Sequence, residues 1–161
     1  MFSISEIIAL AVRIEKNAEA TYRKAIEQSQ NVEVKELLAW MANEEKEHGA
    51  WFSSLEERIG TLQEKQMEDS MEMDGDFISN LIGKQAFSLG GTDFSTIQDT
   101  EQLKEIFVEL ENDTILFYEM MKTFISHGPT LEHLQTIINE EKDHIEQLEK
   151  TPWIFLPERS T

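Results

Sequence analysis

The residue pair best suited to metal chemistry is a glutamate followed three residues later by a histidine, and it occurs twice. The copies are Glu45 with His48 and Glu141 with His144. Three residues turn an α-helix by about 300°, so both side chains project from one side of the helix, about one turn apart. A carboxylate and an imidazole at this spacing suit one divalent ion. A single such pair on a helix is usually solvated, so the second copy and its surroundings decide whether these pairs bind a metal.

The two pairs belong to a repeat between the halves of the chain. Residues 43–48 read Asn-Glu-Glu-Lys-Glu-His, and residues 139–144 read Asn-Glu-Glu-Lys-Asp-His, an offset of 96. The same offset relates Glu15 to Glu111, and each is followed seven residues later by a tyrosine, Tyr22 or Tyr118. A repeat kept for packing alone would be clearest in its apolar residues, whereas this one is clearest in ionisable residues. Two interpretations of the tyrosines remain open: hydrogen-bond partners of ligand carboxylates, or core aromatics with a polar tip.

The repeated ionisable residues interrupt apolar stripes. Two stripes have steps of four, three and four residues: Met41, Glu45, His48, Phe52 and Ile137, Glu141, His144, Leu148. Glu15 and Glu111 interrupt apolar stripes in the same way, between Val12 and Tyr22 and between Val108 and Tyr118. Since this is helical spacing, the sequence predicts four helices that direct acids at the centre of a bundle.

Four buried carboxylates without compensation would be very unfavourable. The sequence offers no lysine or arginine at matching inward positions, whereas two divalent ions would neutralise the four charges. Carboxylate and imidazole ligands suit iron or manganese, and bundles with this ligand pattern hold two iron or manganese ions. We therefore predict a centre of two iron ions, with manganese or zinc as alternatives, bound by Glu15, Glu45, His48, Glu111, Glu141 and His144.

The neighbouring acids are predicted to take no part in this centre. Those beside the motifs are expected to point into solvent: Glu44, Glu47, Glu140 and Asp143. Glu19 lies four residues after Glu15 and could add a ligand, but a position at the rim or surface is favoured. His127 and His133 have no partner at helical spacing and are expected at a cap or on the surface.

The elements that must position these residues are four long helices, predicted over residues 5–29, 32–60, 100–126 and 130–150. Only 3 prolines and 7 glycines interrupt the chain, which favours long helices. Ser3 to Glu6 and Asp99 to Gln102 read as N-terminal capping signals. Gly128 suits a left-handed cap that ends the third helix, and Thr130 suits the N-cap of the fourth.

Two short links and one long connection over residues 61–99 predict the topology. We expect one all-α domain over residues 1–161, a ferritin-like four-helix bundle of two antiparallel hairpins joined by a crossover. A short helix is expected within the crossover, and the apolar tail, with Trp153, is expected to dock against the body. Apolar residues of the crossover need a surface, which favours a homodimer or higher homo-oligomer.

Composition excludes several classes of function. The formal net charge is −18, from 14 basic and 32 acidic residues, which disfavours nucleic acid as a partner. The chain has no cysteine, which excludes disulfides and thiolate metal sites. No run approaches the ~20 apolar residues of a membrane span, and no signal peptide is visible. We expect a cytoplasmic protein with no membrane partner.

With these motifs established, the chain resembles the rubrerythrin branch of the ferritin-like superfamily. The resemblance rests on both Glu-x-x-His pairs and both Glu-to-Tyr spacings, and it covers residues 5–150. It implies that Glu45 and Glu141 bridge two irons and carry the chemistry. Under it, one iron is completed by Glu15 and His48 and the other by Glu111 and His144. Rubrerythrins are thought to reduce hydrogen peroxide and then to be re-reduced by an electron donor.

Two departures from the rubrerythrin pattern bear on function. This chain lacks the four cysteines of a rubredoxin site, so the donor is expected to be a separate protein. Thr114 stands where rubrerythrins carry a further glutamate. We therefore keep two alternatives to a peroxide- or dioxygen-reacting enzyme: iron binding and ferroxidation for iron handling, and a metal-bound structural or interaction protein.

Overall fold

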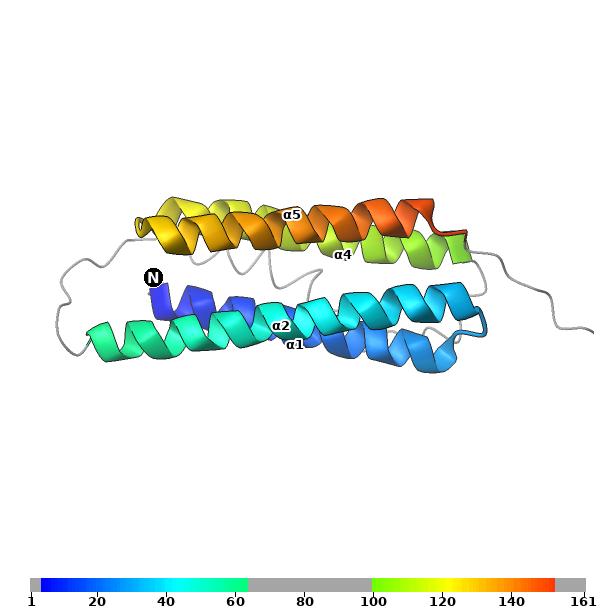
Figure 1. Ribbon diagram of the computed structural model, residues 1–161, viewed down its shortest axis with the longest axis horizontal. Helices are drawn as coiled ribbons and strands as arrows, with labels where there is room; N and C mark the ends of the chain where they lie inside the picture. The colour runs from blue at the N-terminus through cyan, green and yellow to red at the C-terminus, as the bar shows by residue number, and fades with distance from the viewer. Residues whose placement is uncertain (1–3, 64–99, 153–161) are drawn as a thin grey trace, which may run out of the picture.

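The computed structural model describes residues 4–63 and 100–152, which form helices joined by short turns. The long helices are α1 (Ile4–Gln28), α2 (Val32–Gln63), α4 (Thr100–Met121) and α5 (Gly128–Lys150), and a 3-10 helix, η4 (Lys122–Phe124), follows α4. Figure 1 shows α1 and α2 as one hairpin and α4 and α5 as a second hairpin stacked on it. The predicted all-α, ferritin-like four-helix arrangement is confirmed.

The first hairpin is close to the prediction. Helix α1 carries Glu6 in its first turn, where a negative charge interacts favourably with the helix dipole and stabilises the helix. It ends one residue earlier than predicted, and α2 extends three residues further, to Gln63. The turn between them is fixed by Asn31, whose Oδ1 accepts a hydrogen bond from the backbone N of Val34 at 3.2 Å and so caps α2.

The turn of the second hairpin corrects two predictions. Gly128 is not a left-handed cap, since no glycine in the described residues has a positive φ. It is instead the first residue of α5. The N-cap is His127, not Thr130: the His127 Nδ1 accepts a hydrogen bond from the backbone N of Thr130. Pro129 fits the first turn because its missing N–H would have no partner there.

The third predicted helix also ends earlier than residue 126. The α-helical part stops at Met121, and the chain tightens into η4 before Ile125 becomes extended, with φ −106° and ψ 123°. A tighter final turn is common where a helix must reverse direction over a few residues. The shorter helix leaves the ionisable part of α4 in its predicted position.

The core consists of two apolar clusters, each built from all four long helices. One includes Ile8, Phe52, Phe117 and Ile137, and the other includes Ala18, Leu38, Phe107 and Leu148. Along every helix, the predicted metal ligands lie between the residues of the two clusters. A polar layer therefore crosses an otherwise apolar interior. Contacts within each hairpin are denser than contacts between the hairpins.

Some predictions lie outside the described residues. These are the capping signals at Ser3 and Asp99, the short helix within the crossover, and the docked tail with Trp153. In the described part of the chain, no helix is long and apolar enough to cross a membrane.

Candidate metal centre

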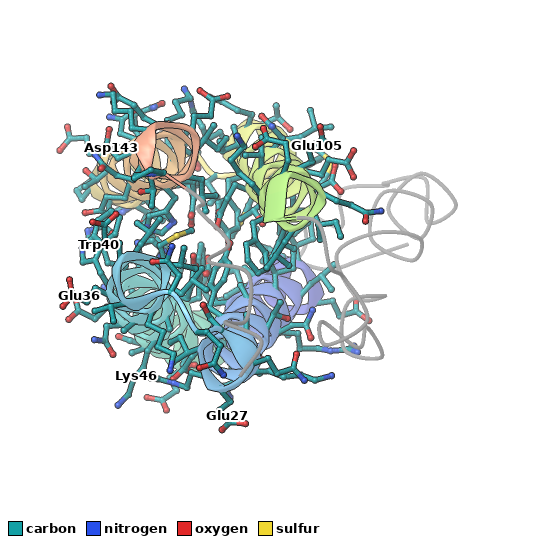
Figure 2. The ribbon with its side chains drawn as sticks, turned by 90° about the vertical axis from the view of Figure 1, so that its right-hand side faces the viewer. Glu27, Glu36, Trp40, Lys46, Glu105 and Asp143 are labelled. Carbon is teal, nitrogen blue, oxygen red and sulfur yellow. The ribbon has the colours of Figure 1, made fainter. Side chains whose placement is uncertain are left out.

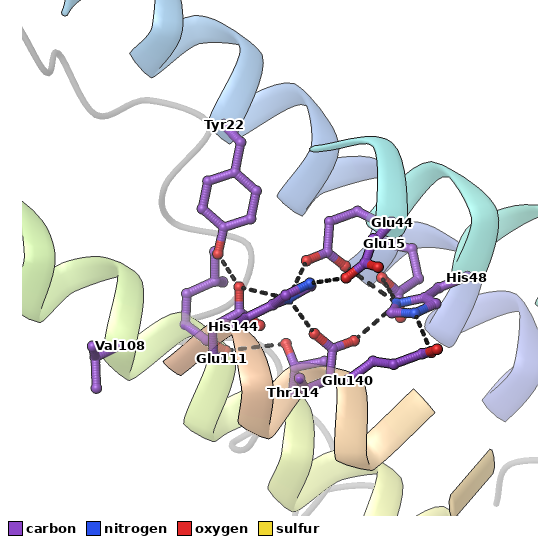
Figure 3. A network of polar contacts seen from close by, with 12 residues as sticks. Glu15, Tyr22, Glu44, His48, Val108, Glu111, Thr114, Glu140 and His144 are labelled. Carbon is purple, nitrogen blue, oxygen red and sulfur yellow. Dashed lines mark hydrogen bonds and ion pairs between the residues drawn. The ribbon is translucent and has the colours of Figure 1, made fainter. Parts of the chain in front are cut away.

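The six predicted ligands meet in the polar layer, and each is at most 5% exposed. Two overlapping groups have potential ligand atoms that all lie within 4.8 Å of one another: Glu15, Glu45, His48, Glu141 and Glu45, Glu111, Glu141, His144. Glu45 and Glu141 belong to both groups. Helices α1 and α4 each supply one carboxylate, and α2 and α5 each supply a carboxylate and an imidazole. Figure 3 shows side chains from both hairpins converging on this layer.

The His48 imidazole faces the first group through Nδ1. This atom lies 3.1 Å from Oε1 of Glu141, 3.6 Å from Oε2 of Glu45 and 3.8 Å from Oε2 of Glu15. These atoms therefore surround one position in the interior, on the side of the centre nearer to Glu15.

The His144 imidazole faces the second group in the corresponding way. Its Nδ1 lies 3.0 Å from Oε2 of Glu141, 3.2 Å from Oε1 of Glu45 and 3.7 Å from Oε1 of Glu111. Glu45 and Glu141 thus each direct one carboxylate oxygen toward His48 and the other toward His144. A carboxylate that bridges two metal positions must direct one oxygen toward each of them, as these two do.

Six buried atoms of the centre make no hydrogen bond: Glu15 Oε2, Glu45 Oε1, His48 Nδ1, both Oε atoms of Glu141 and His144 Nδ1. Buried polar atoms without partners are rare, because each loses its hydration without compensation. These atoms face one another, and their types are oxygen and imidazole nitrogen. The donor set therefore fits two divalent ions of the iron or manganese kind.

The tyrosines connect the two hairpins at this layer. The Tyr22 hydroxyl of α1 donates a hydrogen bond to Oε1 of Glu111 on α4. The Tyr118 hydroxyl of α4 donates to Oε1 of Glu15 on α1. Both tyrosines are fully buried. Each also packs against a phenylalanine ring, Phe107 for Tyr22 and Phe52 for Tyr118, so both interpretations of these residues hold together.

The structure corrects the prediction for two of the neighbouring acids. Glu44 and Glu140 are only partly exposed, and they contact the outer nitrogens of the histidines across the hairpins. Oε2 of Glu44 lies 2.8 Å from Nε2 of His144, and Oε2 of Glu140 lies 3.0 Å from Nε2 of His48. A carboxylate that accepts the Nε2–H proton fixes the tautomer and leaves Nδ1 free to bind a metal. The missed signal was the repeat, because each ligand glutamate of α2 and α5 follows another glutamate.

The other acids and the histidine that the sequence placed outside the centre, Glu19, Glu47, Asp143 and His133, lie away from the polar layer. Glu47 and Asp143 are exposed. Glu19 bonds to Arg23 at 2.8 Å on the surface of α1. His133 is exposed and stacks on Trp51 with ring centroids 4.4 Å apart.

Burial and crowding of charge shift the pKa values of the carboxyl groups. Burial raises the pKa of Glu111 to about 7; the Glu141 charge adds to this, and the contact with His144 opposes it. Burial, with the charges of Glu141, Glu111 and Glu15, also raises the pKa of Glu45. Burial alone would raise the pKa of Glu141, but both histidines lower it below its usual range.

At the two histidines, the contacts with carboxylates outweigh the effect of burial on the pKa. Burial alone would lower the pKa of His48, but its contacts with Glu141, Glu15 and Glu45 raise it well above the usual value. The pKa of His144 is raised in the same way by its carboxylate contacts. These raised pKa values favour the protonated imidazoles in the metal-free protein, because a positive charge on each ring is stabilised by the carboxylates around it.

Two small residues shape the centre. A methyl group added at Gly49 would lie 3.3 Å from Cβ of Glu15, so glycine permits the close approach of α1 and α2 beside this ligand. Thr114 is buried, and its hydroxyl donates to the backbone carbonyl of Leu110 at 3.0 Å. Because threonine has no carboxylate, the position supplies no further acidic ligand.

Comparisons with known proteins agree with this architecture. Two solved structures are similar over 92% of this chain. One is a protein from Thermotoga maritima described as ferritin-like and diiron-carboxylate, with 21% identity, 93% of its own chain covered and a TM-score of 0.66. The other is a hypothetical protein from Pyrococcus furiosus, with 18% identity, 87% of its chain covered and a TM-score of 0.68. At these identities the likeness shows the fold alone.

A comparison with curated proteins found no match. The family model for rubrerythrin matches residues 6–151, which contain all six predicted ligands and all of the four long helices except the first two residues of α1. The chain therefore belongs to the rubrerythrin family.

Proposed function

We propose that the centre binds two iron ions and reduces hydrogen peroxide to water with electrons from a separate donor protein. One observation carries the proposal. Glu45 and Glu141 each direct one carboxylate oxygen toward His48 and the other toward His144. Membership of the rubrerythrin family supports iron as the metal.

The ligand roles follow from the two groups of atoms. Glu45 and Glu141 would bridge, because they alone belong to both groups. Glu15 and His48 would complete one position, and Glu111 and His144 the other. Four carboxylates would neutralise two divalent ions, so the buried layer would carry no net charge when it is loaded.

The chain's own residues would hold this centre for reaction. When bound, two ferrous ions would supply the two electrons that convert one hydrogen peroxide and two protons into two waters. Tyr22 and Tyr118 fix the outer oxygens of Glu111 and Glu15, so these carboxylates keep their orientation. Glu44 and Glu140 hold the imidazoles with Nδ1 directed inward. The apolar clusters on both sides exclude water, which strengthens electrostatic interactions in the layer.

Iron handling is the second candidate function, since the formal net charge of −18 attracts cations. Repeated turnover with a reductant separates it from peroxide reduction. An enzyme returns to its starting state after each cycle, whereas a handling protein accumulates oxidised iron.

The test begins with metal-free protein loaded anaerobically with ferrous iron and freed of excess. Separate portions are mixed with peroxide and with air-saturated buffer, and the near-ultraviolet rise from oxidised iron is followed. Much faster oxidation by peroxide, at two irons per chain, is the expected result. Equal or faster oxidation by dioxygen, with further iron taken up, would favour iron handling. Glu19→Gln, a change at the surface, is the control variant.

A further inference from the structure

The surroundings of the two histidines are not identical, although the repeat relates both Glu-x-x-His pairs and the glutamates and tyrosines around them. Trp40 of α2 packs its indole edge-on against the His144 imidazole, with ring centroids 5.1 Å apart and an interplanar angle of 88°. The residue that the offset of 96 relates to Trp40 is Thr136, which has no ring. Only the His144 side of the centre therefore has an indole at this position.

Trp40 also reaches the surface. Its side chain is 39% exposed, whereas His144 is fully buried. The indole therefore extends from solvent to a predicted metal ligand, in contact with both.

The surface around Trp40 is acidic. Glu36 lies one helical turn before Trp40 on α2, and Glu44 lies one turn after it. Glu36 is exposed, and Glu44 is partly exposed beside His144. Asp143, the neighbour of His144 on α5, is exposed as well. Figure 2 shows Trp40, Glu36 and Asp143 on the same side of the molecule. An exposed aromatic ring among acids suits a partner that presents basic residues around an apolar contact.

We propose that Trp40 and the acids around it form the docking surface for a basic one-electron carrier protein, and that electrons enter the metal centre through the contact between Trp40 and His144. The proposal rests on the proposed function. Two reduced carriers each lose one electron, and the two electrons leave the protein when one hydrogen peroxide takes up two protons and becomes two waters. The electrons and protons therefore balance.

Docking is tested first, without any metal, by fluorescence. Substitution of Trp51 and Trp153 by phenylalanine leaves Trp40 as the only tryptophan in the chain. Ferricytochrome c, a basic haem protein, is the probe, since its haem quenches nearby indole emission. We expect saturable quenching at low salt that weakens as salt is added. We also expect Glu36→Gln to weaken the binding by about threefold. Quenching that does not saturate, or that is insensitive to salt, would overturn the docking surface.

Electron entry is tested with iron-loaded protein, reduced cytochrome c and peroxide. The rate of cytochrome oxidation is divided by the rate of the peroxide reaction measured in the absence of cytochrome. We expect Trp40→Leu to lower this ratio about tenfold, and Trp40→Phe, which keeps a ring, to lower it less. Trp51→Leu is the matched control, because Trp51 lies on the same helix and stacks on His133 rather than on a predicted ligand.

The outcomes separate this proposal from the proposed function. An unchanged ratio in Trp40→Leu, with normal iron loading and a normal peroxide reaction, overturns electron entry at Trp40 and leaves the proposed function standing. A protein that takes up no iron or does not react with peroxide overturns the proposed function, while the fluorescence titration still decides the docking surface. A melting temperature like that of the unaltered protein shows that each variant is folded.

Discussion

Tyr118 and Glu15 are 103 residues apart in the chain, yet the Tyr118 hydroxyl donates a hydrogen bond to the Glu15 carboxylate in the middle of the bundle. Tyr118 belongs to the hairpin of α4 and α5, and Glu15 belongs to the hairpin of α1 and α2. The bond leaves Oε2 of Glu15 without a partner. The tyrosine therefore fixes one oxygen of the carboxylate and directs the other toward the interior, where the predicted metal lies.

Tyr118→Phe is predicted to weaken metal binding without preventing folding. The ring packing against Phe52 is retained, but Glu15 loses the donor that orients it, and the loss of such an outer partner lowers metal affinity about tenfold or more. Calorimetric titration of metal-free protein with cobalt(II) measures the change. Tyr22→Phe should have an effect of similar size through Glu111. Unchanged affinity in both variants would mean that the tyrosines act only in packing.

Glu141→Ala is predicted to remove the capacity for a second metal. Glu141 belongs to both ligand groups, so its loss takes one ligand from each position. We expect fewer than two metals per chain after loading and desalting, measured by elemental analysis. Glu19→Ala should keep the full amount, because Glu19 contacts Arg23 on the surface. Two metals retained by the Glu141 variant would contradict a bridging role.

Glu44→Gln and Glu140→Gln test the acids that sequence reasoning placed in solvent. Each glutamine keeps the size of the side chain but weakens the contact with the outer histidine nitrogen. We expect metal affinity to fall by about 10- to 100-fold. Glu47→Gln and Asp143→Asn are matched controls, since both residues flank the same motifs and are exposed. Equal effects in the two sets would show that only the general negative charge matters.

The stability of the metal-free protein is predicted to fall as the pH rises from about 5 to about 8. The folded chain holds extra protons in this range, because the pKa of Glu111 is raised from 4.5 to about 7 and those of His48 and His144 are raised above 6.5. Stability decreases with pH wherever the folded state binds more protons than the unfolded state. The lowered pKa of Glu141 does not reverse this trend, since its contribution is already complete near pH 5.

Thermal denaturation in the presence of a chelator, at several pH values, measures this effect. A melting temperature that rises across the range would contradict the protonation of the histidines. Metal binding should show the opposite dependence, because a metal must displace these protons and therefore binds more tightly as the pH rises.

The family, and the six residues that meet in the polar layer, could be predicted from the sequence because two independent patterns coincide. Helical spacing places Glu45 and His48 on the apolar face of their helix, and the offset of 96 repeats the pair at Glu141 and His144. A residue that is both ionisable and in phase with the core is unusual, since burial of a charge is costly. The periodicity that locates the core therefore also located the candidate site.

The contacts between helices could not be predicted in the same way. Glu44 is one residue out of phase with the apolar stripe, and on a single helix that position is indistinguishable from a solvated one. Its partner His144 becomes apparent only when α2 and α5 lie side by side. The start of α5 was misplaced for a local reason: Gly128 and Thr130 both fit cap positions by residue type, and the choice depends on the path of the turn.

Every outer hydrogen bond of the centre crosses from one hairpin to the other: Tyr22 to Glu111, Tyr118 to Glu15, His144 to Glu44 and His48 to Glu140. Each hairpin contributes one tyrosine and one histidine to these bonds, and two glutamates that pair with the tyrosine and histidine of the other hairpin. Two copies of one ancestral hairpin, facing each other across a twofold axis, would thus complete the centre without any further part. The present chain has the geometry of such a homodimer joined into one chain, and Trp40 and Thr136 stand at a position where its two halves differ.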